Sequence, residues 1–317
     1  SVGSAVLAQA VAVAAVMLAD GKLDEVRLWS AGLVNMAVGL VLFGYILKQG
    51  RAFVDLPLWK KTFLVAIPLI PHYLGGELLS SMDKIMIDAL VGKTEAGIYS
   101  LAAVLSAIGI LLWRALTVMF NPFVNAKLGS REFKTIRETV KPLMLVVGVM
   151  CVIAALAAPE IIRILATQEY LAGVAVVPPV AAGVFIHAMY DTFAAVSFFH
   201  KKSTRIMTAT LTAAAVNLVG NFICINAFGY IAAGYVTLIS NLVLTAMHYR
   251  NARIIEKEEI YDPKFSLLAA ILVTVGCLAC NLLYPCLILR YVLIAGLLAL
   301  LWSQRKRVIG MLMDMKV

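Results

Sequence analysis

The feature that most constrains this chain is a series of long apolar runs, each with few charges, that follow one another from end to end. Each run has about 18 residues or more, which is long enough for a helix to cross a bilayer. Strands of a membrane barrel need only about 9–11 residues and alternate in polarity. We therefore predict an all-α polytopic membrane protein with about ten transmembrane helices. The predicted spans are residues 2–19, 29–47, 63–91, 96–120, 142–165, 174–199, 204–226, 229–249, 265–284 and 285–303.

Composition excludes several other classes of protein. The chain is 62% hydrophobic and 14% charged, against about 45–50% and 25% in soluble domains, so a soluble globular enzyme is excluded. The net charge is +9, but the basic residues lie in short clusters between the runs, which suits membrane lipids and topology better than nucleic acid. The pair Cys277 and Cys280 has no second pair or histidines near it in sequence, so no metal is expected. No nucleotide-binding loop is present, and no cofactor is expected.

Topology follows from the distribution of the 27 Lys and Arg residues. When residues near the ends of a run are counted with the adjoining connection, alternate connections hold 20 of them, the intervening connections hold six, and Arg114 lies deeper inside a run. By the positive-inside rule, both ends of the chain are expected in the cytoplasm.

The connection over residues 121–141 has the pattern of an amphipathic helix. Phe133, Ile136 and Val140 are spaced three and four residues apart, and Ser130 could be the N-cap. We expect this helix to lie on the inner leaflet, with a solvated loop helix as the alternative.

The span 63–91 combines helix-breaking residues with a polar face. Pro68, Pro71, Gly75 and Gly76 lie in its first half, so a bend is expected. Five residues follow on one helical face, with His72 and Asp83 beside it: Tyr73, Glu77, Ser81, Lys84 and Asp88. An ionisable side chain facing hydrocarbon costs about 2.5–3.5 kcal/mol, so this face should turn toward protein or water. The alternative for Lys84 and Asp88 is a position near the outer head groups.

The neighbouring spans also carry polar residues at helical spacing. Taken alone, such stripes are typical of helix–helix contacts, and an i, i+4 His–Asp pair can neutralise itself. On several adjacent helices together, they favour a water-filled cavity and a transport path. The residues are Tyr99, Ser106, Arg114 and Thr117; His187 and Asp191; Thr210, Asn217 and Asn221; and Thr237, Asn241, Thr245 and His248.

The stretch FLVAIPLIPHYLGGELLSSMDKIMIDALVGKTEAGIYSLAAVLSAI, residues 63–108, resembles the seventh and eighth helices of bacterial polysaccharide-biosynthesis flippases of the O-antigen type. These belong to the multidrug/oligosaccharidyl-lipid/polysaccharide exporter superfamily. The matching features are Pro68 with Pro71, the segment from Ser81 to Ile87, and VGKTEAGIYS.

The resemblance implies a fold of two six-helix lobes, like that of the multidrug-and-toxin-extrusion transporters, with two extra C-terminal helices. Residues 1–47 would be the last two helices of an incomplete N-terminal lobe, from which four helices are missing. Residues 63–250 would form the complete second lobe, residues 264–303 the additional pair, and residues 304–317 a cytoplasmic tail.

The resemblance further implies a flippase that moves undecaprenyl-diphosphate-linked oligosaccharide across the bacterial cytoplasmic membrane by alternating access, and not an enzyme. Its partners would be the lipid-linked glycan, membrane lipids, and a glycan polymerase and glycosyltransferases. Alternatives are a cation-coupled multidrug antiporter of the same fold, and a membrane polysaccharide polymerase or ligase. Candidate residues of the substrate cavity are Lys84, Arg114, Tyr99 as a sugar-stacking ring, Ser81 and His187. Candidates for ion coupling or charge pairing are Glu77, Asp83, Asp88 and Asp191.

Overall fold

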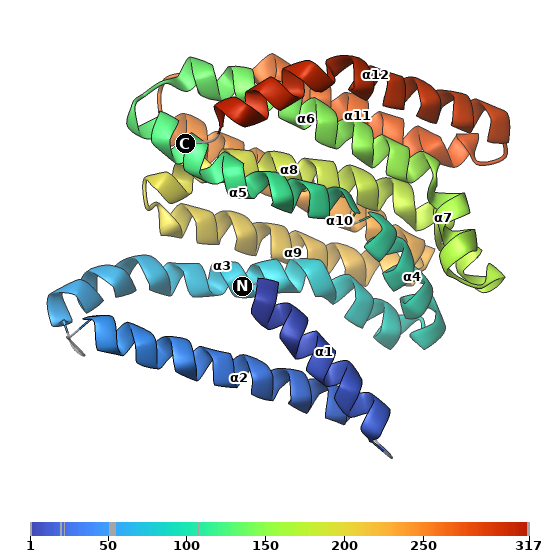
Figure 1. Cartoon of the computed structure of the whole chain (residues 1–317). Coiled ribbons are helices and arrows are strands. Elements are labelled where there is room, and N and C mark those ends of the chain that lie inside the picture. The colour runs from blue at the N-terminus through green and yellow to red at the C-terminus, as the bar shows by residue number, and fades with distance from the viewer. Residues whose placement is uncertain (1, 20, 22, 51–54, 107, 316–317) are drawn as a thin grey trace. The chain divides into compact units, whose positions relative to one another are not determined.

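The computed structural model is helical, with no strand, across the residues that it describes, which are 2–19, 21, 23–50, 55–106 and 108–315 (Figure 1). The predicted all-α fold is confirmed. Lys22, Arg51 and Lys316, which entered the topology prediction, lie outside the described residues. The helices are α1 (Val2–Leu18), α2 (Leu23–Gly50), α3 (Leu56–Leu90), α4 (Lys93–Ser106), α5 (Ile108–Gly129), α6 (Phe133–Leu156), α7 (Ala158–Leu165), the 3-10 helix η1 (Gln168–Val176), α8 (Val177–Phe199), α9 (Ser203–Phe228), α10 (Ile231–Ile255), α11 (Pro263–Leu283) and α12 (Leu287–Asp314).

Within the described residues, eight helices are long and apolar enough to cross a membrane, and a ninth is obtained if α4 and α5 count as one bent span. The protein is thus a multi-pass membrane protein. Ten spans were expected, and the difference has two sources. Helix α1 has 17 residues, fewer than the other candidates, and the run predicted at 96–120 is divided by a bend of 43° between α4 and α5.

The chain divides into two compact units, Ser1–Phe63 and Leu64–Val317. In the first unit, α1 packs against α2. Ala8 and Ala12, one turn apart on α1, are buried, and their small side chains let two helices approach closely.

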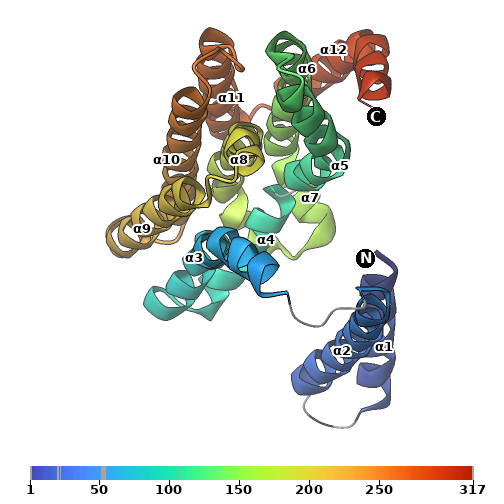
Figure 2. The same ribbon diagram turned by 90° about the vertical axis from the view of Figure 1, so that its left-hand side faces the viewer.

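The second unit is built around α8, which lies in the middle of the bundle, among α5, α6, α10 and α11 (Figure 2). Small residues let the neighbouring backbones approach this helix. A Cβ atom on Gly183 would lie 3.6 Å from the Cα atom of Leu238 in α10. The outer faces of α11 and α12 carry exposed apolar side chains such as Leu272 and Val292, as expected of helices that face lipid.

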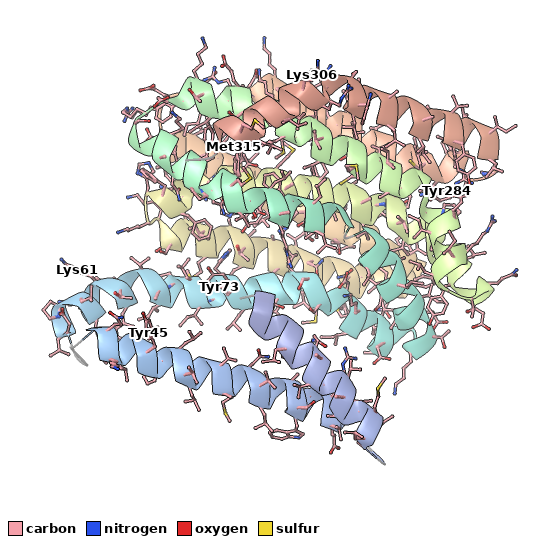
Figure 3. All side chains as sticks on the ribbon, viewed as in Figure 1. Tyr45, Lys61, Tyr73, Tyr284, Lys306 and Met315 are labelled. Carbon is pink, nitrogen blue, oxygen red and sulfur yellow. The ribbon has the colours of Figure 1, made fainter. Side chains whose placement is uncertain are left out.

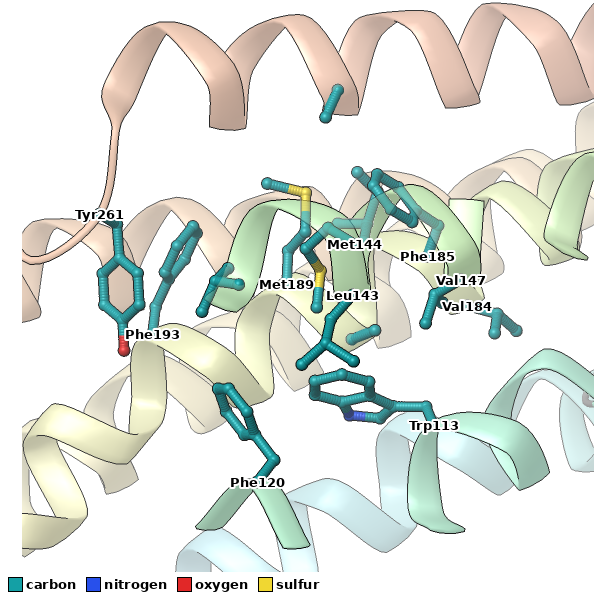
Figure 4. Packing of buried hydrophobic residues seen from close by; sticks show 14 of the residues in the cluster. Trp113, Phe120, Leu143, Met144, Val147, Val184, Phe185, Met189, Phe193 and Tyr261 are labelled. Atoms are coloured by element: carbon teal, nitrogen blue, oxygen red, sulfur yellow. The ribbon is translucent and has the colours of Figure 1, made fainter. Parts of the chain in front are cut away.

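Large apolar side chains fill the interior of the second unit. Trp113 of α5, Leu143 of α6 and Phe185 of α8 belong to one buried cluster (Figure 4). The cluster extends to the α10–α11 connection, where Tyr261 is buried and its ring lies 5.0 Å from that of Phe193. This packing fixes the positions of α5 and α8. The faces of these two helices that point away from the cluster carry polar residues.

The connection predicted as a separate surface helix is instead divided between two long helices. Helix α5 continues to Gly129 and α6 begins at Phe133, with Arg131 in a left-handed turn at φ 57°. Phe133, Ile136 and Val140 are buried in the core of the second unit. Their apolar spacing therefore reflects packing inside the bundle and not contact with the inner leaflet. Ser130 is not the N-cap of α6, which is Glu132; its hydroxyl donates to the Glu132 carboxylate at 2.8 Å.

The acidic connection between α10 and α11 is bound to the basic α5–α6 region and to the end of α8. Arg131 pairs with Glu258 at 2.8 Å, and Lys141 pairs with Asp262 at 2.6 Å. His200, just after α8, lies 2.9 Å from the carboxylate of Glu256. These contacts join the ends of α6, α8, α10 and α11 on one side of the bundle.

On the opposite side, Arg290 joins α12 to the end of α6. This residue lies near the start of the predicted span 285–303, and the structure places it in the first turn of α12 with 2% of its surface exposed. Its guanidinium donates two hydrogen bonds to the carboxylate of Glu160, at 2.6 and 2.7 Å, and a third to the carbonyl of Leu156 at 2.9 Å. Tyr284, labelled in Figure 3, donates to the carbonyl of Ala155. The last carbonyls of α6 are therefore satisfied by the C-terminal helix pair.

Candidate functional site

A cavity of about 510 Å³ lies within the second unit, between α3, α4, α5, α8, α9 and α10. Seven of the nine candidate residues line it. The exceptions are Ser81 and Asp88; the neighbouring Ser80 lines the cavity in place of Ser81. The predicted candidates in the cavity wall are Lys84, Arg114, Tyr99, His187, Glu77, Asp83 and Asp191.

Asp83 is buried, with 4% of its surface exposed, and three donors surround its carboxylate. The hydroxyl of Tyr99 donates to Oδ2, and the backbone N–H of Lys84 donates to Oδ1 at 3.0 Å. The hydroxyl of Thr237 donates to Oδ2 at 3.5 Å. Hydrogen bonds of this kind stabilise the ionised carboxylate. The sequence predicted that Tyr99 stacks on a sugar. Its ring is instead fully buried, so its face is not available to a sugar.

Neutral polar groups extend the surroundings of Asp83 into α9. The side-chain amide of Asn217 donates to Thr237 at 3.4 Å, and that of Asn221 donates to Asn217 at 3.1 Å. The polar stripes predicted on α9 and α10 therefore meet. The described part of the chain has no group of three or more His, Cys, Asp or Glu residues suited to a metal ion.

Asp191 is held by a residue that the sequence did not single out. The indole N–H of Trp113 donates to its Oδ2 at 2.8 Å. The neighbouring His187 instead places Nδ1 3.4 Å from Oδ1 of Asn241. The predicted alternative that His187 and Asp191 simply neutralise each other is not what the structure shows.

Lys84 and Arg114 differ from these acidic residues in lacking partners. Lys84 is half-buried and Arg114 is exposed at the cavity wall. Within the described residues, neither side chain makes a hydrogen bond or an ion pair with another residue, and neither does that of Glu77. The cavity thus combines two hydrogen-bonded carboxylates and one free carboxylate, Glu77, with two cations whose donors are free. Such cations are suited to an anionic ligand, and a guanidinium can bind a phosphate through two hydrogen bonds.

His72 and Tyr190 also line the cavity although neither was a candidate. His72 is 6% exposed, and its Nδ1 lies 2.6 Å from the hydroxyl of Thr210. Tyr190 lies one turn from His187, and their ring centroids are 4.9 Å apart. Helical spacing from the predicted His187 could have identified Tyr190. Trp113 lies on α5, after the bend between α4 and α5, which the sequence did not predict.

Comparison with known proteins gives one family and one structure. Residues 2–124 match the model of a family described as polysaccharide biosynthesis protein, which confirms the resemblance expected from the sequence. No curated protein matches the chain. A structure of a MOP superfamily transporter from Pyrococcus furiosus is 20% identical with a TM-score of 0.49, over 68% of this chain and 51% of that one. The chain thus spans about half the length of that transporter.

The region of the family match includes part of the cavity. Asp83, Lys84, Tyr99 and Arg114 lie within residues 2–124, whereas the α8, α9 and α10 walls lie beyond them.

Proposed function

We propose, from the polysaccharide biosynthesis family pattern in residues 2–124, that this protein is a flippase for polyprenyl-diphosphate-linked oligosaccharides, and not an enzyme. The observation that carries the proposal is the pair of unpaired cations, Lys84 and Arg114, in the wall of a polar cavity. The substrate would be an undecaprenyl-diphosphate-linked glycan, moved across the bacterial cytoplasmic membrane by alternating access.

The negative charge of such a substrate suits a cavity in which Lys84 and Arg114 have free donors. A diphosphate is a compact anion, and its oxygens can accept two parallel hydrogen bonds from Arg114 while Lys84 contributes a point charge. Because Asp83 and Asp191 already accept hydrogen bonds from other residues, their negative charges repel the diphosphate less than free carboxylates would. The polyprenyl tail would remain in lipid, beside the apolar faces of the bundle.

Asp83 is the best placed of the four acidic candidates to respond to a coupling ion. It lies in the cavity wall but is shielded from the open cavity, and its partners belong to α4 and α10. A change in the charge of Asp83 would therefore alter contacts between three helices at once. Asp88, in contrast, is exposed and outside the cavity wall.

The setting of the protein follows from the same proposal. Both ends of the chain would be cytoplasmic, and the protein would contact anionic lipids through its basic connections. Glycosyltransferases would supply its substrate, and a glycan polymerase would use the product. No nucleic acid would be bound.

A cation-coupled antiporter is the second candidate, because Glu77 also lines the cavity without a partner. Such a protein would need the acidic residues of the cavity to bind its substrate, whereas a flippase for a diphosphate would need the basic residues. Substitution of each set separates the two functions.

The test is flipping of a fluorescent undecaprenyl-diphosphate glycan by the protein in liposomes. Hydrogen bonds to charged groups contribute about 1.5–3 kcal/mol, so Lys84→Gln or Arg114→Gln should slow flipping at low substrate by about tenfold or more. Lys134→Gln, at an 87% exposed side chain outside the cavity, is the matched control and should flip normally. Normal rates in both cavity variants, or loss only in Glu77→Gln, would refute the flippase proposal.

A further inference from the structure

Tyr73 on α3 has the free ring surface that Tyr99 lacks. It lines the same cavity, and 63% of its surface is exposed; its position on α3 is labelled in Figure 3. Sequence placed Tyr73 on the polar face of the span without giving it a role. A tyrosine in this position presents an apolar ring and a polar hydroxyl to a ligand.

The ring of Tyr73 contacts a neighbouring ring that is itself held in place. The ring of His72 lies 5.1 Å from that of Tyr73. His72 is held in turn by Thr210, at 2.6 Å, and by the ring of Phe198, at 5.9 Å. An exposed ring with a fixed neighbour loses less conformational freedom when a ligand binds.

The space above the ring is kept open by Gly76. Side chains on a helix lean toward its N-terminus, so a side chain at position 76 would extend over Tyr73. A Cβ atom built on Gly76 meets nothing within 4 Å, which shows that the space is open and that a larger residue would fit there. Gly76 and Glu77 both line the cavity beside Tyr73, and the unpaired carboxylate of Glu77 can accept hydrogen bonds from hydroxyl groups.

We propose that Tyr73, Gly76 and Glu77 form a carbohydrate subsite, which binds sugar units of the oligosaccharide at a distance from its diphosphate. This inference rests on the proposed flippase function. The C–H face of a sugar packs on the ring of Tyr73, in the space left by Gly76, and sugar hydroxyls donate to Glu77. The three residues thus combine an apolar surface with a charged acceptor, as carbohydrate requires.

Spacing along α3 sets which sugar units reach the subsite. Lys84 is 11 residues beyond Tyr73, or about 16 Å along the helix axis at 1.5 Å per residue. This separation exceeds the length of a single sugar ring. With its diphosphate at Lys84, a lipid that carries one sugar does not reach Tyr73, whereas a longer oligosaccharide does.

The test compares the binding of two lipids to the purified chain in nanodiscs: undecaprenyl diphosphate with one hexose and with four hexoses. Wild type should bind the four-hexose lipid more tightly. Tyr73→Ala should weaken that binding by about two- to tenfold, the range of a lost aromatic contact, and leave the one-hexose lipid unaffected. Tyr73→Phe, which keeps the ring, should retain most of the affinity, and Gly76→Leu should lose it through obstruction.

Two controls separate this inference from the flippase proposal. Tyr291→Ala removes an exposed tyrosine, 49%, on α12 of the same unit, outside the cavity wall, and should change neither affinity. Lys84→Gln should weaken both lipids alike. Equal affinity of wild type for the two lipids, or an equal loss of both in Tyr73→Ala, would overturn the subsite while the flippase proposal stands. Failure of wild type to bind either lipid would overturn both.

Discussion

Removal of the Glu160 carboxylate should destabilise the protein more than removal of any exposed acidic group. Arg290 is 2% exposed, and Glu160 accepts both of the hydrogen bonds that neutralise it. In Glu160→Gln, the guanidinium stays buried and loses its counter-charge. Loss of one partner from a buried ion pair costs about 3–5 kcal/mol. The Glu160 side chain is 21% exposed, so we expect the lower end of that range, about 3 kcal/mol.

The matched control is the exposed pair of Lys134 and Glu138. Its atoms are 3.8 Å apart, with side chains 87% and 66% exposed, so Glu138→Gln should cost no more than about 0.5 kcal/mol. The double variant Glu160→Gln with Arg290→Met should recover most of the loss, because it leaves no buried charge. The assay is unfolding of the purified protein in mixed micelles by increasing SDS. Equal midpoints for Glu160→Gln and Glu138→Gln would refute the reasoning.

The same pair predicts how stability depends on pH. The hydrogen-bonded Arg290 guanidinium lowers the pKa of the Glu160 carboxyl, relative to about 4.3 in an unfolded chain. The stabilisation is therefore fully present above that value and is lost as the pH falls below about 4. Glu160→Gln should lack this part of the acid dependence.

Three further predictions concern topology, the cation site and the buried carboxylate. Single-cysteine labelling tests four exposed positions, two expected inside, Ser130 and Lys202, and two outside, Thr94 and Gln168. Labelling of the first two in intact cells would reverse the orientation. Arg114→Lys should export glycan more slowly than wild type at equal abundance, because it loses bidentate binding; normal export would exclude that role. Tyr99→Phe removes a donor to buried Asp83, so the unfolding free energy should fall by about 1–3 kcal/mol, and an unchanged value would contradict the described hydrogen bond.

The sequence predicted the parts of the site that depend on helical periodicity. The polar face of α3, with Glu77 and Lys84, and the polar residues of α8 to α10 were found by spacing alone, since a helix fixes which residues share a face. The all-α fold followed from the length of the apolar runs in the same way.

Features that depend on tertiary packing were not predictable from spacing. Tyr99 shares the polar face of its helix, yet its ring is buried because Asp83 of α3 lies within reach of its hydroxyl. The burial of Arg290 was not predicted, because its partner, Glu160, is 130 residues away in the chain. Phe133, Ile136 and Val140 have a spacing that fits either a lipid surface or a bundle core, and only the neighbouring helices decide between them.

The central claim is that the cavity of the second unit binds a lipid diphosphate through Lys84 and Arg114. Its most direct test measures binding of undecaprenyl diphosphate, uncharged undecaprenol and a lipophilic cation to the protein in nanodiscs. We predict saturable binding of the diphosphate alone, and its loss in the double variant Lys84→Gln with Arg114→Gln at unchanged thermal stability. Equal binding of the diphosphate by the double variant and wild type, or saturable binding of the lipophilic cation alone, would contradict the claim.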